Sequence, residues 1–141
     1  MASLKTKLVV KNVFKQIHKK VQKGAKEGFD TVALDLKETS SRGAPFKTGH
    51  LEANHMDIEY GVGSWKALIY FVAFNEDFDY GLEMHEGTYN LGPKSRTKQG
   101  GNSKFAGSVP VGRKYAERTV EQGRDNYQQY IADKIIEGLE D

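Results

Sequence analysis

A run of apolar residues near the amino terminus constrains the fold more than any other feature of the chain. The residues recur at steps of three and four, which places them on one stripe of an α-helix. They are Val10, Phe14, Ile17, Val21, Ala25, Phe29, Val32 and Leu36. We therefore predict a long amphipathic helix over roughly residues 9 to 37. Its start is open, because Leu4, Leu8 and Val10 also alternate as in a strand. In that alternative the first ten residues form a short strand or an arm, and the helix begins near Asn12, a suitable cap.

Two glycines lie within this stripe, and a cluster of small residues follows it. Gly24 and Gly28 each weaken an exposed helix by about 1 kcal/mol relative to alanine, so they mark either a bend or a close contact with another helix. The segment from Glu38 to Lys47 contains Ser40, Ser41, Gly43 and Pro45, which are typical of a loop. Because proline also disfavours helix in the residue before it, we expect the first element to end in this segment.

An alternating pattern that begins at His55 predicts a strand. Its apolar positions are Met56, Ile58, Tyr60 and Val62, and its polar positions are His55, Asp57 and Glu59. Gly63–Ser64 is a connection that favours a tight hairpin turn, and residues 65–74 are rich in aromatic and β-branched side chains. We therefore predict an antiparallel hairpin. Its second strand is apolar on both faces, so we expect the domain's own helices to cover one side and a neighbouring subunit the other.

The last third of the chain combines a polar segment with a second helical stripe. Residues 89–107 are rich in glycine, basic and small polar residues, which predicts a long flexible loop. The stripe then resumes at Ala116, Val120, Gly123, Tyr127, Ile131, Ile135 and Leu139, which predicts a long helix to the end of the chain. The order helix, hairpin, loop, helix predicts an α+β fold in a single domain that spans residues 1–141.

The absence of cysteine excludes a disulfide framework, a thiolate zinc site and a cysteine nucleophile. No apolar run approaches the roughly 18 to 20 residues needed to span a bilayer. The lysine-rich start also lacks the apolar stretch of a secretory signal. We therefore expect a soluble protein that is not exported and does not associate with membranes.

Residues capable of chemistry are present, but their spacing defines no site. Metal-ligand types occur at His50, His55, His85, Glu52, Glu59, Glu83 and Glu86, in no metal-binding pattern. No Gly-x-Ser-x-Gly elbow marks a nucleophile, and the glycines at 92, 100, 101 and 107 match no phosphate-binding motif. His85 and Glu86 are a candidate acid–base pair of a hydrolase, although Gly87–Thr88 after them is more typical of a turn. We therefore expect no catalytic residue, metal or cofactor.

Charge is distributed along the chain in blocks. Residues 1–26 carry eight lysines and no acid, at positions 5, 7, 11, 15, 19, 20, 23 and 26. Such lysines suit phosphate contacts, which keeps a nucleic-acid-binding module as an alternative function. An acidic block of Glu76, Asp77, Asp79, Glu83 and Glu86 precedes a basic, acid-free zone between Gly87 and Ala116. The basic residues of this zone are Lys94, Arg96, Lys98, Lys104, Arg113 and Lys114. The two blocks are either solvated faces or the two sides of a contact between subunits.

Two short motifs complete the pattern, at Thr48-Gly49-His50-Leu51-Glu52-Ala53-Asn54 and at Tyr80-Gly81-Leu82-Glu83-Met84-His85-Glu86-Gly87-Thr88. With the order of elements, they resemble the small neck proteins of long-tailed bacteriophages. These are called head-tail connector, tail completion or minor capsid proteins, and include the Z-type tail proteins of lambda-like phages. A typical member has a Thr-Gly-x-Leu-x-x-Ser/Asn segment before a hairpin and then Tyr-Ala-x-x-x-Glu-x-Gly-Thr. This chain departs from the pattern at Gly81 and at Glu52, where alanine and a basic residue are usual.

The resemblance implies a non-enzymatic virion protein that joins head and tail as a ring around the DNA channel. Its implied partners are identical copies, head-closure or connector proteins, and a tail terminator or tail tube, with non-specific proximity to packaged DNA. The alternative in the same setting is a tail terminator or head-closure protein. A closed ring requires two different complementary patches on each copy. Glu76, Asp77 and Asp79 are candidates for one patch, with Glu83 and Glu86 beside them, and Lys94, Arg96 and Lys98 for the other.

Overall fold

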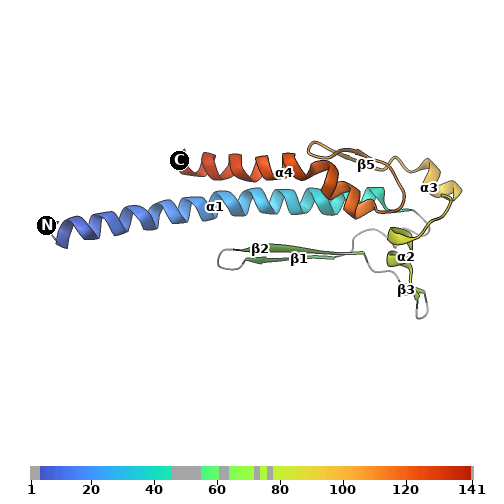
Figure 1. Ribbon diagram of the computed structural model, residues 1–141, viewed down its shortest axis with the longest axis horizontal. Coiled ribbons are helices and arrows are strands. Elements are labelled where there is room, and N and C mark those ends of the chain that lie inside the picture. The colour runs from blue at the N-terminus through green and yellow to red at the C-terminus, as the bar shows by residue number, and fades with distance from the viewer. Residues whose placement is uncertain (1–3, 46–54, 61–63, 72–73, 76–77, 141) are drawn as a thin grey trace. The chain divides into compact units, whose positions relative to one another are not determined.

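The computed structural model describes residues 4–45, 55–60, 64–71, 74–75 and 78–140 (Figure 1). Its helices are α1 (Leu4–Gly43), α2 (Tyr80–Glu86), α3 (Pro93–Thr97) and α4 (Tyr115–Glu140). Its strands are β1 (His55–Tyr60), β2 (Trp65–Tyr70), β3 (Phe74–Asn75), β4 (Phe78–Asp79), β5 (Gly101–Ser103) and β6 (Gly107–Val109). The strands pair as antiparallel hairpins, β1 with β2, β3 with β4 and β5 with β6. The predicted α+β class, with a long helix first and last, is confirmed. Among the described residues, no helix is both long enough and apolar enough to cross a membrane.

The chain forms two compact units that share the two long helices. The first unit takes Met1–Val32 and Tyr127–Asp141, and the second takes Ala33–Asn126. The prediction of a single domain rested on the absence of a linker between two cores. Because α1 and α4 are continuous through both unit boundaries, each unit is assembled from parts of the same helices.

In the first unit, α1 and α4 contact each other at glycines. A Cβ atom added to Gly24 would lie 2.4 Å from the carbonyl oxygen of Lys134, and one added to Gly28 would lie 3.0 Å from the Cα atom of Ile131. One added to Gly138 would lie 3.0 Å from a carbonyl oxygen of α1. Only residues without a side chain allow the two backbones to approach this closely. The close helix contact predicted for Gly24 and Gly28 is therefore confirmed.

Helix α1 extends beyond its predicted bounds in both directions. It begins at Leu4, so the strand or arm considered for the first ten residues is wrong. It also continues to Gly43 through most of the segment that was expected to be a loop. The small residues there are compatible with helix because Thr39 and Ser40 are buried in tight packing, and Ser41 Oγ donates a hydrogen bond of 2.7 Å to the carbonyl four residues earlier.

Groups from distant parts of the chain cap the end of α1. The ammonium group of Lys98 donates hydrogen bonds to the carbonyl oxygens of Ser41, at 3.0 Å, and Ala44, at 2.7 Å. The backbone N–H of Gly112 donates to the carbonyl of Gly43 at 3.1 Å. These bonds satisfy carbonyls that lack partners within the helix, and the cation complements the negative end of the helix dipole. The cap explains how the helix can extend as far as Gly43.

The predicted antiparallel hairpin is confirmed by the pairing of β1 with β2. Its register places Tyr60 opposite Trp65, so four residues separate the strands and the two-residue connection predicted at Gly63–Ser64 is wrong. The second strand ends at Tyr70 rather than continuing to residue 74. The shorter strand leaves Phe71 outside the hairpin, where its ring contacts Tyr115 edge to face with centroids 5.2 Å apart.

One face of this hairpin is entirely apolar. It consists of three cross-strand pairs, Met56–Ile69, Ile58–Ala67 and Tyr60–Trp65. The rings of the last pair meet edge to face with centroids 5.4 Å apart. None of the side chains described in β1 and β2 is buried, and Tyr60 is 47% exposed. The structure therefore leaves this face incompletely covered.

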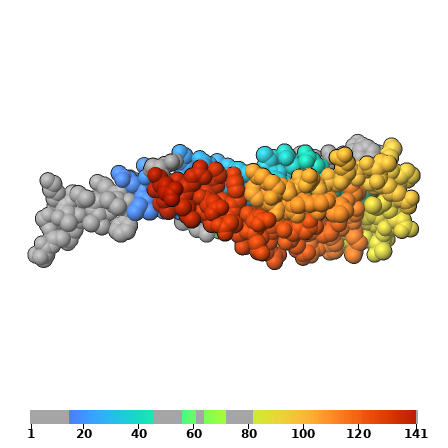
Figure 2. All heavy atoms as spheres, turned by 90° about the horizontal axis from the view of Figure 1, so that it is seen from above, coloured from blue at the N-terminus to red at the C-terminus, as the bar shows by residue number. Residues whose placement is uncertain are grey.

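The segment 89–107 is structured, and the prediction of a long irregular loop is wrong. It contains α3 and the start of the β5–β6 hairpin, and in the space-filling view it lies as a continuous surface against the end of α1 (Figure 2). Ser103 Oγ donates a 2.6 Å hydrogen bond to Asp35 of α1 and accepts the backbone N–H groups of Phe105 and Ala106, each at 3.0 Å. The left-handed φ angle of 74° at Gly107 explains one of the glycines that suggested flexibility.

Helix α4 confirms the second predicted helix, but its buried face is shifted by one residue in the second unit. Tyr115 and Thr119 are buried, whereas Val120, which belongs to the predicted apolar stripe, is 42% exposed. Thr119 is tolerated in this position because its hydroxyl donates to the carbonyl of Tyr115 at 2.8 Å. Two polar side chains of α4 also hold the β5–β6 turn, since Gln122 and Asn126 donate to carbonyls of that hairpin at 2.8 to 3.1 Å.

Candidate functional site

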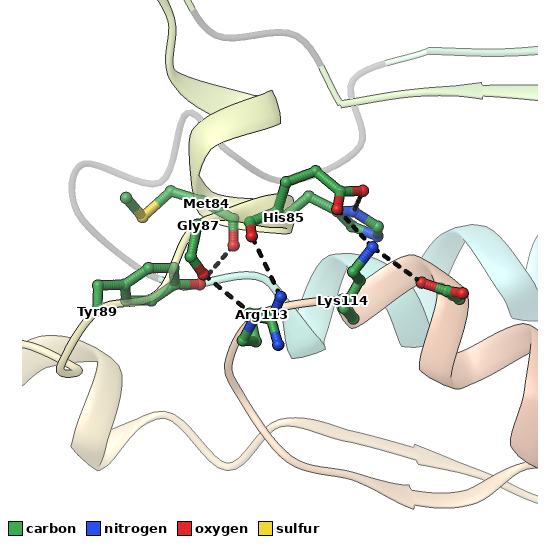
Figure 3. A network of polar contacts seen from close by, with 8 residues as sticks. Met84, His85, Gly87, Tyr89, Arg113 and Lys114 are labelled. Atoms are coloured by element: carbon green, nitrogen blue, oxygen red, sulfur yellow. Dashed lines mark hydrogen bonds and ion pairs between the residues drawn. The ribbon is translucent and has the colours of Figure 1, made fainter.

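The carboxyl end of α2 meets the amino end of α4 at a dense polar contact, which we call the α2–α4 junction (residues 83–89 and 113–117; Figure 3). Every carbonyl from Glu83 to Gly87 accepts a hydrogen bond here. The N–H of Gly87 donates to the carbonyl of Glu83 at 2.7 Å, and the hydroxyl of Tyr89 donates to the carbonyl of Met84. The N–H of Lys114 donates to the carbonyl of His85 at 2.7 Å. The Arg113 guanidinium donates to the carbonyls of Glu86 and Gly87 at 3.2 Å each. A helix end this completely satisfied is held rigidly.

Gly87 permits the chain to leave α2 at this point. A Cβ atom added there would lie 2.6 Å from the carbonyl oxygen of Glu83. Any larger residue would therefore break the turn that follows the helix. Helix α2 ends at Glu86, directly before Gly87–Thr88, and neither of these two residues has regular secondary structure.

Lys114 has an unusual backbone on the α4 side of the junction. Its φ angle of 59° is left-handed, and it is the only such non-glycine residue in the described part of the chain. This conformation costs of order 1 kcal/mol or more and persists only where the surroundings enforce it. Here the N–H of Lys114 donates to His85, and its carbonyl accepts the N–H of Arg118 at 2.8 Å to begin α4.

The side chain of Lys114 bridges the two helices electrostatically. Its ammonium group forms an ion pair with Glu86 and a second one with Glu117, at 3.3 Å. Hydrogen bonding from Lys114, and then from the ring of His85, lowers the pKa of the Glu86 carboxyl below its ordinary value of 4.5. The same contact with Glu86, followed by that with Glu117, raises the pKa of Lys114 above 10.5. Both groups are therefore charged at neutral pH.

His85 connects this polar contact to the core of the second unit. Its Nδ1 atom lies 2.9 Å from Glu86 Oε1, and its ring meets buried Tyr115 edge to face with centroids 4.8 Å apart. Tyr115 in turn forms a core with Ala44, against which Met84 also packs. The Nε2 atom of His85 is buried without a hydrogen-bond partner among the described residues. The side chain of His85 is thus 19% exposed, whereas that of Glu86 beside it is 49% exposed.

The junction contains the charged and hydrogen-bonding groups needed to fix two helices. Across the residues that the structure describes, no three side chains of the types that ligate metals lie together. The oxygen atoms of Glu86 that would act as a base are engaged by Lys114 and His85. The arrangement therefore serves to position the motif residues.

The motif residues fall partly within the described structure. Thr48, Gly49 and Leu51 lie outside the described residues, and Tyr80 is the first residue of α2. Glu86 and Gly87 belong to the junction, while the side chain of Thr88 is exposed. The second motif is therefore explained by helix termination at its Glu-Gly-Thr end.

The residues predicted to form a contact between subunits have different environments. Glu76 and Asp77 lie outside the described residues, and of Asp79 only the backbone, in β4, is described. Glu86 and Lys98 are engaged within the chain, by Lys114 and by the end of α1. Glu83, Lys94 and Arg96 are exposed. The structure thus brings an acidic-block residue together with a basic-zone residue inside one copy, in the pair Glu86–Lys114.

Arg113 and Lys114 are the junction residues whose role the sequence did not indicate. They lie 26 and 27 residues beyond Gly87, and both belong to a basic zone that was considered only as a block. The only local indication of their role is that they directly precede a helical stripe, because the first turn of a helix must form there. That signal predicts a turn, but it does not predict which carbonyls the turn would contact.

Comparison with models of protein families, with curated proteins and with solved structures found no match to this chain.

Proposed function

We propose that this chain is a non-enzymatic virion protein that joins the head and tail of a long-tailed phage by assembling as a ring at their junction. The proposal begins from the resemblance of the two motifs and the order of elements to phage neck proteins. It is supported by a site that positions helices and holds its acidic residue in ion pairs, an arrangement suited to assembly rather than to chemistry. The mechanism is geometric, since each copy must offer surfaces that a neighbour covers.

The observation that carries the proposal is the apolar face of the β1–β2 hairpin. A two-stranded hairpin is marginally stable in water unless a hydrophobic face packs against something else. Met56, Ile58 and Ile69 on this face are only half-buried, and Tyr60 is 47% exposed. Contiguous apolar surface of this kind marks a contact with another protein. A neighbouring copy in a ring would supply the missing cover.

A second exposed apolar residue lies in the motif itself. Leu82 on α2 is 60% exposed, and it directly precedes the residues that the junction holds. A rigidly positioned apolar side chain loses little conformational entropy when a partner covers it. Leu82 is therefore suited to contact the next protein of the neck, while the junction behind it fixes its direction.

Electron microscopy of lysates from phage lacking this gene tests the proposal. We expect full heads and separate tails that fail to unite, and joined particles once the wild-type protein is supplied. Infectious particles that contain none of the protein would refute the proposed role.

A matched pair of hairpin variants tests the surface. Ile58→Glu places a charge on the apolar face, and Leu68→Glu places the same charge on the opposite face, where Leu68 is paired with Asp57. Both variants disturb the same hairpin, so a difference between them reports the contact. We expect Leu68→Glu to complement the deletion at least about tenfold better than Ile58→Glu, because a buried unpaired carboxylate is the costlier change. Equal complementation by the two variants would rule out the apolar face as the contact.

A further inference from the structure

The two helices of the first unit carry opposite charges on their outer sides. On α1, the side chains of Lys15, Lys19, Lys23 and Lys26 are all exposed, and no acid occurs from residue 15 to residue 26. At 3.6 residues per turn these four fall within an arc of about 80°. We call them the lysine stripe. The glycines that contact α4, Gly24 and Gly28, lie about half a turn away around the same helix. The stripe therefore points away from α4.

Helix α4 carries the matching acidic side chains. Asp133, Glu137 and Glu140 are exposed, and Ile136 among them is 53% exposed. These residues, which we call the acidic stripe, lie about half a turn from Ile131, whose backbone faces Gly28 of α1. The acidic stripe thus points away from α1. Within one copy the two stripes lie on opposite sides of the glycine contact and cannot pair.

The two stripes match in length as well as in charge. Lys19, Lys23 and Lys26 have the spacing i, i+4 and i+7, and Asp133, Glu137 and Glu140 have the same spacing. Each set therefore spans about 10 Å along its helix. Because each copy carries one stripe of each sign, a lysine stripe can meet the acidic stripe of the next copy, and the contact leaves both copies with an unused stripe. This is the head-to-tail type of contact that generates rings or filaments.

We infer that the lysine stripe of α1 binds the acidic stripe of α4 in a second copy of this chain. This inference rests on the proposed function, since it names the surfaces through which copies associate. Three of the residues already have partners on their own helix, Lys26 with Asp30 at 2.9 Å, Glu137 with Lys134 at 3.2 Å, and Asp133, which accepts a hydrogen bond from Gln129 at 2.8 Å. All three contacts are exposed to solvent, so they can be exchanged for pairs between copies with little cost. Exposed ion pairs are individually weak, and the association is weak and sensitive to salt.

Sedimentation of the purified full-length chain tests the inference with a charge swap. One variant reverses the matched part of the lysine stripe (Lys19→Glu, Lys23→Glu, Lys26→Glu), a second reverses the acidic stripe (Asp133→Lys, Glu137→Lys, Glu140→Lys), and a third combines both sets. We expect each single set to weaken association at low salt by at least about tenfold, since three pairs become repulsive. The combined set restores association to within a few-fold of the wild type, because the pairs form again with their signs exchanged.

Two controls separate this contact from other effects of charge. Arg42→Glu, Lys66→Glu and Arg124→Glu change the net charge by the same amount at exposed positions of the second unit, and should leave association within about threefold. Circular dichroism verifies that each variant remains helical. A combined set that associates no better than either single set would overturn the inference, as would a wild-type chain that stays monomeric at low salt.

A DNA duplex added to the wild-type chain separates this contact from a nucleic-acid site. Two results together would overturn the inference in favour of a polyanion site. The duplex would bind the lysine stripe more tightly than a second copy of the chain does, and the combined set of substitutions would fail to restore association between copies. The proposed function is tested separately in particles. If copies associate through the stripes but infectious particles contain none of the protein, the proposed role in joining phage heads to tails is refuted. The inferred contact between copies is then unaffected.

Discussion

Replacing Gly24 by alanine should destabilise the protein, although the same change stabilises most exposed helices. Alanine favours helix over glycine by about 1 kcal/mol. At Gly24, however, the added Cβ atom would lie 2.4 Å from the carbonyl oxygen of Lys134 and 2.9 Å from the Cα atom of Ile135. Both are backbone atoms, so no side-chain rotation relieves the clash, and α1 and α4 must move apart within the first unit.

The structure also sets the magnitude of this effect. Overpacking a close contact costs about 1–3 kcal/mol, and a clash with backbone lies at the upper end of that range. Subtracting about 1 kcal/mol for helix propensity leaves a net loss of about 2 kcal/mol. Gly28→Ala and Gly138→Ala meet backbone at 3.0 Å, so their losses should be smaller. Gly92→Ala has no atom within 4 Å of the new Cβ and a φ of −71°, and it should stabilise slightly through the unfolded chain.

Urea unfolding followed by circular dichroism measures this series. The expected order of stability is Gly92→Ala at or above the wild type, then Gly28→Ala and Gly138→Ala, then Gly24→Ala. The loss should appear in the midpoint without a change in slope, because the unfolded surface is the same. A Gly24→Ala variant that is as stable as the wild type would show that α1 and α4 are not in backbone contact, and would refute the reasoning.

Two further predictions concern the polar contacts of the second unit. Lys98→Met keeps the aliphatic stem but leaves the carbonyls of Ser41 and Ala44 without their charged donor, so it should lower stability by about 1–2 kcal/mol in the same assay, with the exposed Lys66→Met nearly neutral. Glu86→Gln should lower the unfolding midpoint at pH 7, and the difference from the wild type should shrink on acidification. The reason is that the lowered pKa of Glu86 makes its contribution complete above its ordinary value of 4.5, and that contribution is lost as the pH falls through the lowered value. Because the pKa of Lys114 is raised above 10.5, Lys114 stays charged throughout this acidification. A difference in unfolding midpoint between Glu86→Gln and the wild type that is the same at pH 3 as at pH 7 would contradict the assigned ion pair.

Periodicity predicted the two long helices and the main hairpin because each of these elements carries apolar residues at the regular spacing of its own backbone. The end of α1 was missed because composition was taken as a sign of irregular backbone. Ser40, Ser41 and Gly43 are small because other segments pack closely on them, and a Cβ atom added to Gly43 would lie 3.3 Å from Val109. Small residues are common both in loops and at close packing contacts, so composition alone cannot distinguish the two. The residue that packs on Gly43, Val109, lies 66 residues further along the chain.

The segment 89–107 was mistaken for a long irregular loop for a related reason. Gly100 and Gly107 have φ angles of 80° and 74°, so they are required by specific turns rather than by mobility. A Cβ atom added to Gly101 would lie 2.6 Å from the carbonyl oxygen of Thr39, so this glycine allows β5 to approach α1. The hairpin is stabilised by side chains of α1 and α4, such as Asp35 and Gln122, whose contribution no local pattern reveals.

The candidate site was predicted in its residues but not in its pairing. Glu86 and Gly87 stood out in the motif, and the turn after α2 followed from local rules. Their partners Arg113 and Lys114 are joined to them only by tertiary structure, which a spacing argument over 26 residues cannot supply. The acidic and basic blocks are therefore not used only between copies, because Glu86 already pairs with Lys114 within one chain and fixes α2 there.

Several residues of the predicted apolar stripes lie at the surface of the first unit. Ile17 and Leu139 belong to the predicted apolar stripes, yet they are 44% and 41% exposed, and Ile136 beside them on α4 is 53% exposed. The apolar stripe of a helix includes every position that is buried in the functional protein. A single copy buries only those positions that pack against other parts of the same chain. In the first unit, glycines hold α1 and α4 so close that their contact is narrow, and the flanking apolar residues stay at the surface. Exposed positions on an otherwise regular stripe are what a chain that completes its core with a second copy would show.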